Sequence, residues 1–399
     1  MVNGHKKNKY QGETTMRILF FISIFSIYSL LHLYVFLKMR GAFAFGGVIA
    51  FFLITFMVLM VGAPFVVRLL ERFEFDAFAR VISYIGYSWM GLVFLFFFCS
   101  VVIDLYRILL YTMGIILHKE FYLLTPSPGF AFFAALLPTL AIAVLGYYEA
   151  RSIRTETVVI SSPKIPEEIG TITIAQISDV HLGLIVRHER LKGILNAVKM
   201  GNPDILVSTG DLVDGQIDNL TGLAELLKAV NPPYGKFAIT GNHEFYAGLD
   251  QALRFFKSAG FTVLRGETHN AAGIITVAGI DDPTGKYFGS YRGVSEDSLL
   301  SQNRNERFVL LLKHMPSVKK EALGLFDLQL SGHTHKGQIF PFSLVTRLFF
   351  PNHSGLIDLP HGSKLYVSRG SGTWGPPIRF LSPPEVTIIK LVHMPKNEH

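Results

Sequence analysis

The chain has 399 residues, of which half are hydrophobic and only 17% are charged, and its formal net charge is +7. Residues 151–399 carry 26 Lys and Arg against 23 Asp and Glu, so this part is nearly neutral and no nucleic-acid partner is expected. The single cysteine, Cys99, excludes a disulfide within the chain. Because the apolar excess lies before residue 150, the sequence predicts two regions of different kinds.

Residues 1–150 are predicted to form a transmembrane region. They contain four apolar runs, each close to the roughly 20 residues that a helix needs to cross a bilayer. The runs cover residues 18–37, 42–67, 81–103 and 130–148. The first run lacks the small-residue cleavage site of a secretory signal, so we expect it to remain as an anchor. Four crossings would place both ends of the region on one side of the membrane.

The orientation follows from the basic residues that flank the four runs. One set of flanks contains Lys6, Lys7, Lys9, Arg17, Arg68, Arg72, Arg80, Arg151, Arg154 and Lys164, and the other contains Lys38, Arg40, Arg107 and Lys119. The first, more basic set should be cytoplasmic. We therefore expect a multi-pass protein of the cytoplasmic (inner) membrane whose later domain lies on the cytoplasmic side. Asp104 and Arg107 are interpreted either as an ion pair at the outer membrane boundary or as an ionisable site inside the helix bundle.

Residues 151–170 are predicted to be a linker with a first strand, and residues 171–395 a separate domain. From Thr171 onward, short β-rich runs alternate with amphipathic helical ones, which is typical of an α/β fold. From residue 273 onward the β-rich runs have fewer helices between them. This change predicts a second sheet that packs on the first.

Residues of the kind that bind metals follow five of these predicted strands, at the point where each strand ends. Open α/β sheets place their ligand sites at the carboxyl ends of the strands, and the glycines at these junctions let the backbone turn sharply. The five junctions are Asp179-Val180-His181, Gly210-Asp211, Gly241-Asn242-His243-Glu244, His314 and Gly332-His333-Thr334-His335. A lone histidine at a strand end is usually an ordinary hydrogen-bonded residue, but so many ligand-type residues in this order predict a metal centre.

This ordered set resembles the five motif blocks of the calcineurin-like metallophosphoesterase superfamily, over about residues 157–392. The sequence around these blocks is similar to that of the membrane-associated bacterial branch of YaeI- and YkuE-type phosphodiesterases. The similar segments include Ser331-Gly332-His333-Thr334-His335-Lys336-Gly337-Gln338 and Gly372-Thr373-Trp374-Gly375-Pro376-Pro377. The resemblance implies a four-layer α/β/β/α sandwich, which agrees with the predicted strands. It also implies a metal-dependent phosphoric ester hydrolase.

The resemblance further implies which side chains would hold two divalent metal ions. The ligands would be Asp179, His181 and His335 for the first ion, Asn242, His314 and His333 for the second, and Asp211 as the bridge. Mixed nitrogen and oxygen ligands favour Mn, Fe or Zn, and the ions would hold the bridging hydroxide that attacks phosphorus in line. His243 would contact the phosphate and protonate the leaving oxygen. Asp214 and Glu244 are expected to orient ligand imidazoles.

An apolar segment, residues 339–351, follows the last predicted ligand. It is interpreted either as a flap that meets a lipid chain or the bilayer surface, or as a segment packed on its own domain. Since the predicted helices confine the domain to the membrane, we expect a lipid-linked phosphoester or pyrophosphate as substrate. Arg369 and Arg379 are candidates to clamp a second phosphate, or else to form surface ion pairs. Two alternatives stay open: a phosphodiesterase for soluble nucleotides or cyclic nucleotides, and a non-catalytic membrane scaffold.

Overall fold

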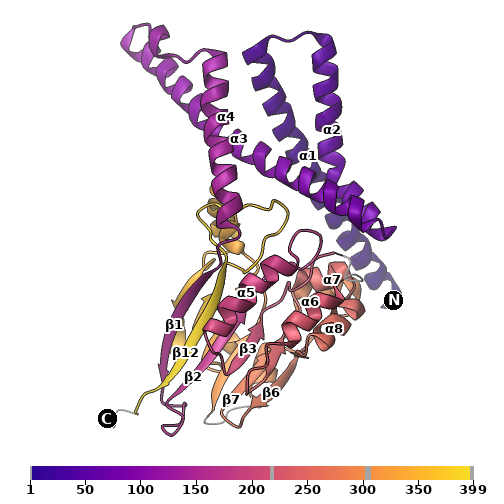
Figure 1. Cartoon of the computed structure of the whole chain (residues 1–399), viewed down its shortest axis with the longest axis vertical. Coiled ribbons are helices and arrows are strands. Elements are labelled where there is room, and N and C mark those ends of the chain that lie inside the picture. The colour runs from indigo at the N-terminus through magenta and orange to yellow at the C-terminus, as the bar shows by residue number, and fades with distance from the viewer. Residues whose placement is uncertain (1, 216–219, 302–306, 396–399) are drawn as a thin grey trace. The chain divides into compact units, whose positions relative to one another are not determined.

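The structure is a computed structural model of the chain, and it describes residues 2–215, 220–301 and 307–395 (Figure 1). The chain divides into two compact units. The first comprises Met1–Leu69 and Val81–Val144 and is called the helical unit. The second comprises Leu70–Arg80 and Leu145–His399 and is called the sheet unit.

Long apolar helices make up the helical unit. Within the described residues they are α1 (Val2–Phe43), α2 (Gly47–Arg72), α3 (Asp76–Leu117) and α4 (Pro128–Glu149), and the short η1 (Tyr122–Leu124) precedes α4. The stretches that are long and apolar enough to cross a membrane are Ile22–Phe43, Gly47–Arg72, Asp76–Leu117 and Tyr122–Glu149. The prediction of four apolar helices ahead of the sheets is confirmed, although α1 and α3 extend beyond the predicted runs.

The four helices share a small apolar core, while most of their large side chains face outward. The core is formed by Val35 and Phe36 of α1, Met57 of α2, Val93 and Phe96 of α3, and Phe132 and Ala135 of α4. Helices α2 and α3 approach closely where a Cβ on Gly86 would lie 2.7 Å from the Cβ of Ala63. Outward side chains such as Phe51 and Ile116 are exposed, as expected of helices whose solvent is lipid.

Two six-stranded sheets form the centre of the sheet unit in the residues that the structure describes. The first sheet has the order β1-β12-β2-β3-β4-β5, and its strands are β1 (Arg154–Ser162), β12 (Glu385–His393), β2 (Thr171–Ile177), β3 (Ile205–Ser208), β4 (Lys236–Ala238) and β5 (Thr262–Val263). The second has the order β10-β11-β9-β8-β7-β6, and its strands are β10 (Gly355–Asp358), β11 (Lys364–Val367), β9 (Leu328–Ser331), β8 (Phe308–Leu312), β7 (Ile275–Gly279) and β6 (Glu267–Ala271).

Helices and short turns connect these strands. They are α5 (His188–Met200), α6 (Thr221–Lys228), α7 (Asn242–Ala247), α8 (Leu249–Ser258), η2 (Pro283–Phe288), α9 (Glu296–Ser301), η3 (Lys320–Ala322), η4 (His335–Gly337), α10 (Phe342–Phe349) and η5 (Pro360–Gly362). Strands β2, β3 and β4 pair in parallel, and so do β7, β8 and β9. Parallel pairing requires each connection to cross back over the sheet, which is why helices lie on its outer face.

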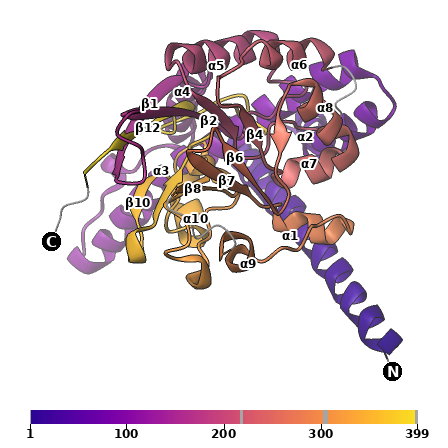
Figure 2. The ribbon, with the colours of Figure 1, turned by 90° about the horizontal axis from the view of Figure 1, so that it is seen from below.

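The side chains of β2 alternate between two apolar layers, as expected for a strand that is buried on both faces. Ile172 and Ile174 lie between the two sheets, in a buried cluster with Phe237 of β4 and Phe308 of β8. Ile177 faces the other way, into a cluster with α5, α6 and α8, which lie along one face of the first sheet (Figure 1, Figure 2). A third cluster packs the second sheet against α9 and η3. The predicted four-layer α/β/β/α sandwich is therefore confirmed.

Candidate metal centre

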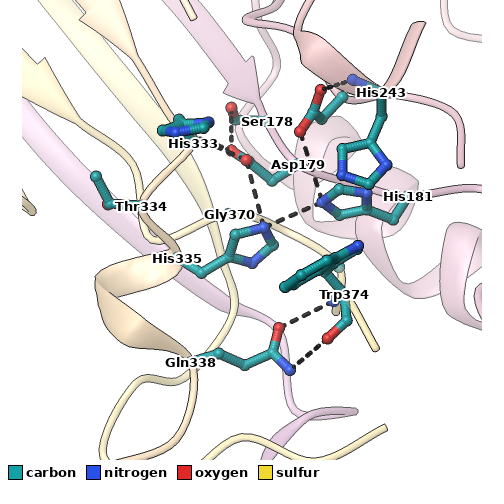
Figure 3. Close-up of polar contacts among 12 residues, drawn as sticks. Ser178, Asp179, His181, His243, His333, Thr334, His335, Gln338, Gly370 and Trp374 are labelled. Atoms are coloured by element: carbon teal, nitrogen blue, oxygen red, sulfur yellow. Dashed lines mark hydrogen bonds and ion pairs between the residues drawn. The ribbon is translucent and has the colours of Figure 1, made fainter. Parts of the chain in front are cut away.

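The predicted metal ligands meet at one edge of the two sheets, where parallel strands from each sheet end. Asp179 and His181 follow β2, Asp211 follows β3, Asn242 begins α7 after β4, His314 follows β8, and His333 and His335 follow β9. Figure 3 shows Asp179 and His181, from the loop after β2, close to His335, from the loop after β9. The sandwich thus brings side chains from distant parts of the sequence into one buried cluster.

Most of these ligands have an unusual backbone conformation. The φ angle is positive at Asp179 (51°), His181 (55°), Asp211 (52°), His333 (70°) and His335 (47°). This left-handed region is uncommon for residues other than glycine, and it costs about 1 kcal/mol or more per residue. Such strain persists only where the surrounding structure compensates for it, and it concentrates at functional sites.

The first group of ligand atoms comes from Asp179, His181 and His335, whose atoms lie within 4.8 Å of one another. The Nε2 atoms of His181 and His335 are 3.0 Å apart, and Nε2 of His335 is 3.4 Å from Oδ1 of Asp179. Oδ2 of Asp211 lies 3.9 Å from Nε2 of His181. The atoms of Asp179, His181 and His335 are therefore close enough together to hold one cation, and Asp211 adjoins this group through His181.

The second group of ligand atoms comes from Asp211, His314, His333 and Asn242. Oδ2 of Asp211 lies 3.2 Å from Nε2 of His314. Nε2 of His314 is also 3.2 Å from Nδ1 of His333. Oδ1 of Asn242 lies 3.2 Å from Nε2 of His314 and 3.1 Å from Nδ1 of His333. Since Oδ2 of Asp211 belongs to both groups, this one oxygen connects them.

The chemistry of this donor set fits divalent cations. Burial lowers the pKa of His181 to about 4 and that of His333 to about 3, so both imidazoles are neutral at pH 7, the form that coordinates metals. Burial opposes ionisation of Asp211, but the neighbouring His314 and His243 outweigh it and hold the pKa of Asp211 well below its usual range. The neutral imidazoles of His181 and His333 and the buried carboxylate of Asp211 are therefore in the forms that coordinate a cation.

The hydrogen bonds around the ligands fix which atoms face the cluster. Nδ1 of His314 donates to the backbone carbonyl of Thr209 at 2.8 Å, which leaves Nε2 free to coordinate. The backbone N–H of His333 donates to Asp179 at 2.9 Å, and the hydroxyl of Ser178 donates to the same carboxylate. These contacts hold the ligand side chains in place before any ion binds.

His243 lies beside the first group but has a different environment. Its Nδ1 is 2.9 Å from Oδ1 of Asp214, and its ring centroid is 4.6 Å from that of His181. Burial disfavours the charged imidazole, but Asp211 and Asp214 outweigh it and raise the pKa of His243 to about 9. His243 also forms a group with His181 and Asp211 that is close enough to hold a cation. Its raised pKa suits a proton donor.

Comparison with known proteins identifies the family. Residues 172–337 match the family model described as calcineurin-like phosphoesterase. The chain belongs to this family. It is therefore a metal-dependent phosphoester hydrolase, and the cluster described above is the candidate metal centre of its metallophosphoesterase domain.

The relatives of this metallophosphoesterase include both shorter chains and membrane proteins. An uncharacterized metallophosphoesterase of Aquifex aeolicus is 44% identical, over 62% of this chain and 96% of the relative. The uncharacterized metallophosphoesterase YkuE of Bacillus subtilis is 32% identical, over 61% of this chain and 87% of its own length, which supports the predicted YkuE-type branch. A transmembrane protein with metallophosphoesterase domain from Danio rerio is 33% identical, over 64% of this chain and 62% of the relative.

Glu244 has a role that differs from the predicted one. The sequence led us to expect that Glu244 orients a ligand imidazole, but its fully buried carboxylate accepts hydrogen bonds from backbone N–H groups. The donors are Asp211 at 3.0 Å, Leu212 at 2.8 Å, Val213 at 3.2 Å and Gly241 at 2.7 Å. Glu244 thus ties two ligand loops together. Its position as the third residue of a helix that begins after Gly241 is a capping signal that could have been recognised in the sequence.

The prediction that Arg369 and Arg379 clamp a second phosphate does not fit their positions. Arg379 is fully buried and donates to the carbonyls of Gly372 and Ser382, at 2.8 and 3.0 Å. Its Nη2 also lies 3.1 Å from Nδ1 of His335, so it positions a candidate ligand. Arg369 forms ion pairs with two carboxylates, those of Glu156 and Glu385. Both guanidinium groups are occupied by the protein itself, because tertiary packing directs them inward.

We expect Glu244→Gln to destabilise the protein, because an amide NH₂ would face buried N–H donors that now bind a carboxylate. Leaving such donors unsatisfied costs about 2 kcal/mol or more. The melting temperature of the full chain in detergent should therefore fall by about 4 °C or more. Glu225→Gln, a change of the same kind at an exposed position of α6, serves as the control and should leave the melting temperature unchanged. Equal melting temperatures for the two variants would show that the carboxylate does not hold the loops.

Proposed function

We propose that this chain hydrolyses a phosphoester or pyrophosphate bond of a lipid-linked substrate at the membrane surface. The observation that supports this is the exposed apolar face of α10, which follows the last predicted ligand. Leu344, Leu348 and Phe349 are 58%, 81% and 75% exposed. Phe350, directly after the helix, has its ring centroid 5.4 Å from that of His333. An apolar surface therefore begins next to the candidate metal centre.

A soluble substrate would not account for this surface. Contiguous exposed apolar side chains are characteristic of sites that meet a lipid or a protein. In our proposal residues 1–150 act as the transmembrane region, residues 151–170 as the linker with the first strand, and residues 171–395 as the metallophosphoesterase domain. Because this anchor would confine the domain to the membrane, a substrate in the same bilayer would reach a high effective concentration. The apolar face of α10 would then contact the lipid chain while the phosphate reaches the metal centre.

We assign two divalent cations to the candidate centre, with Asp211 shared between them. The first would be held by Asp179, His181 and His335, and the second by Asn242, His314 and His333. Nitrogen ligands favour Mn, Fe or Zn over Mg. When bound, such cations supply Lewis-acid activation of the phosphoryl group and of the attacking water.

The chain itself would supply the proton for the leaving group. His243 is protonated at neutral pH, and its Nδ1 is held by Asp214 at 2.9 Å, which leaves Nε2 as the donor. We propose that Nε2 gives its proton to the oxygen that leaves phosphorus. Asp214 would keep the ring oriented and stabilise its charged form.

We also propose that the domain lies on the cytoplasmic side of the inner membrane, because the flanks on that side of the four helices carry more Lys and Arg. A reporter enzyme that is active only in the cytoplasm should be active when fused after the last residue, His399. A second reporter, active only outside the cytoplasm, should be inactive at the same position. The reverse result would place the domain outside.

The site assignment predicts that metal content and turnover respond differently to two substitutions. We expect the parent chain to retain two divalent cations, and Asp211→Asn to lose both the metals and the activity. His243→Ala should keep the metals but lose about 10²- to 10⁴-fold in kcat on phosphoester substrates, which is the usual contribution of general acid catalysis. Elemental analysis and steady-state kinetics of the purified chain measure the two effects.

The control for these variants is His361→Ala, since His361 is exposed on η5 and is not assigned to the centre. It should match the parent in both measurements. If Asp211→Asn kept its metals and its turnover, the assigned centre would be wrong. If His243→Ala lost its metals, His243 would be a ligand and not the proton donor.

The lipid assignment predicts a substrate-dependent effect at α10. In the double variant Leu348→Gln and Phe349→Gln, turnover of a lipid phosphoester in mixed micelles should fall at least about tenfold, because burial of each side chain contributes about 1.5–3 kcal/mol. Turnover of a small soluble phosphoester should stay at the parent rate. Met200→Gln, an equally exposed apolar position on α5, is the matched control. Faster turnover of nucleotides or cyclic nucleotides than of any lipid, unchanged in the double variant, would overturn the lipid assignment.

A further inference from the structure

The helical unit contains a cavity of about 220 Å³ that the metal centre does not use. Its walls come from α1, α3 and α4, and they include Lys38, Ser100, Asp104 and Arg107 among otherwise apolar residues. Lys38 lies near the last residue of α1, Phe43, and the cavity also touches the first turn of α4. The cavity therefore lies near the boundary of the membrane-crossing stretches and not at their centre.

One acidic group in this cavity is already neutralised. Asp104 accepts a hydrogen bond from the hydroxyl of Tyr34 at 2.6 Å and forms an ion pair with Lys38. Lys38 and Asp104 therefore cancel each other's charge. The direct partners of Asp104 are thus Lys38 and Tyr34 of α1, and not Arg107, with which the sequence had suggested a pair as one of two alternatives.

With two basic groups, Lys38 and Arg107, and one acidic group, Asp104, the cavity has an excess of positive charge at Arg107. Its Nη2 donates to the backbone carbonyl of Pro126 at 2.6 Å, and its buried Nε has no hydrogen-bond partner. Among the described residues, no carboxylate forms an ion pair with it. A charged group with an unsatisfied donor is costly in an apolar surrounding, and an anion would remove both costs. The cavity thus carries one net positive charge.

The start of α4 adds to the attraction for an anion. Pro128, Ala131 and Phe132 of its first turns line the cavity, so the positive end of the helix dipole lies there. Pro128 has no N–H, and the N–H groups of Phe130 and Ala131 donate to Ser127, so this helix start contributes its dipole and not free N–H groups. Together with the unpaired donor of Arg107, this makes two independent features that favour an anion in the same cavity.

We propose that this cavity binds the phosphate group of a membrane phospholipid. A phosphodiester headgroup carries one negative charge, which matches the net charge of the cavity, whereas inorganic phosphate carries about 1.5–2 charges at pH 7. The apolar side chains of Leu37, Ile103 and Phe132 in the walls suit the adjoining glycerol and acyl chain. Basic pockets between membrane helices are known to bind lipid headgroups. The proposal is independent of the lipid substrate proposed above.

The test is the thermal unfolding of the purified full chain in detergent, titrated with three probes: phosphatidylglycerol, a diacylglycerol of the same chain length, and inorganic phosphate. Only phosphatidylglycerol should raise the melting temperature of the parent. In Arg107→Gln the concentration needed for half of this effect should rise at least about tenfold, as expected from the loss of a charged hydrogen bond. Lys119→Gln removes one exposed charge just after α3 and should behave as the parent does.

A second variant keeps the test decisive if Arg107→Gln does not fold. Gly41 lines the cavity, and a Cβ added there would have no atom within 4 Å, so Gly41→Leu fills the space without displacing the backbone. It should melt near the parent temperature and no longer respond to phosphatidylglycerol. A parent-like response in either variant, or an equal response to diacylglycerol or inorganic phosphate, would overturn the proposal.

Discussion

The structure of the site depends on one buried carboxylate, that of Asp211. Its Oδ2 lies 3.2 Å from His314 and 3.9 Å from His181, so it faces both groups of ligand atoms, while Oδ1 accepts the backbone N–H of His243 at 2.9 Å. Burial of this charge demands compensation. Burial also opposes a charged His314, but Asp211 outweighs it and raises the pKa of His314 well above its usual range. Protons and divalent cations therefore compete for the same site, and metal binding must release protons as pH-dependent metal sites do.

The close packing of the ligand loops around Asp211 depends on glycines in two of them. Gly210, just before Asp211, has a φ of 93°, and a Cβ there would lie 2.7 Å from Nδ1 of His314. At Gly332 a Cβ would overlap Ser178 and the carboxylate of Asp179. These contacts explain why each ligand follows its strand after so short a turn. The first sheet supplies Asp211 and the second supplies His314, so the stacking of the two sheets itself assembles the site.

The sequence predicted those parts of the fold and of the site that depend on the periodicity of apolar residues or on the order of motifs along the chain. The alternation along β2 predicted a strand buried on both faces, and the order of ligand-type residues predicted which strands end at the site. The sequence did not predict the roles of polar side chains that form hydrogen bonds with backbone groups. Glu244 binds N–H groups of residues more than 30 positions away, and Arg379 binds carbonyls in its own loop. Long side chains such as Arg379 can turn inward or outward, and only tertiary packing decides between these, so the sequence could not choose between a phosphate clamp and contacts within the protein.

The exposed face of α10 bears on how binding energy would be divided in the proposed reaction. Burying Leu344, Leu348 and Phe349 against a lipid chain would contribute about 5 kcal/mol in total, using the usual value for large apolar side chains. That is a substantial part of the 8 kcal/mol or so that corresponds to micromolar affinity. If the lipid chain supplies most of the ground-state affinity, the metal centre need not bind the phosphate tightly before reaction. Its electrostatic interactions can then be strongest in the transition state, which is the condition for a high rate.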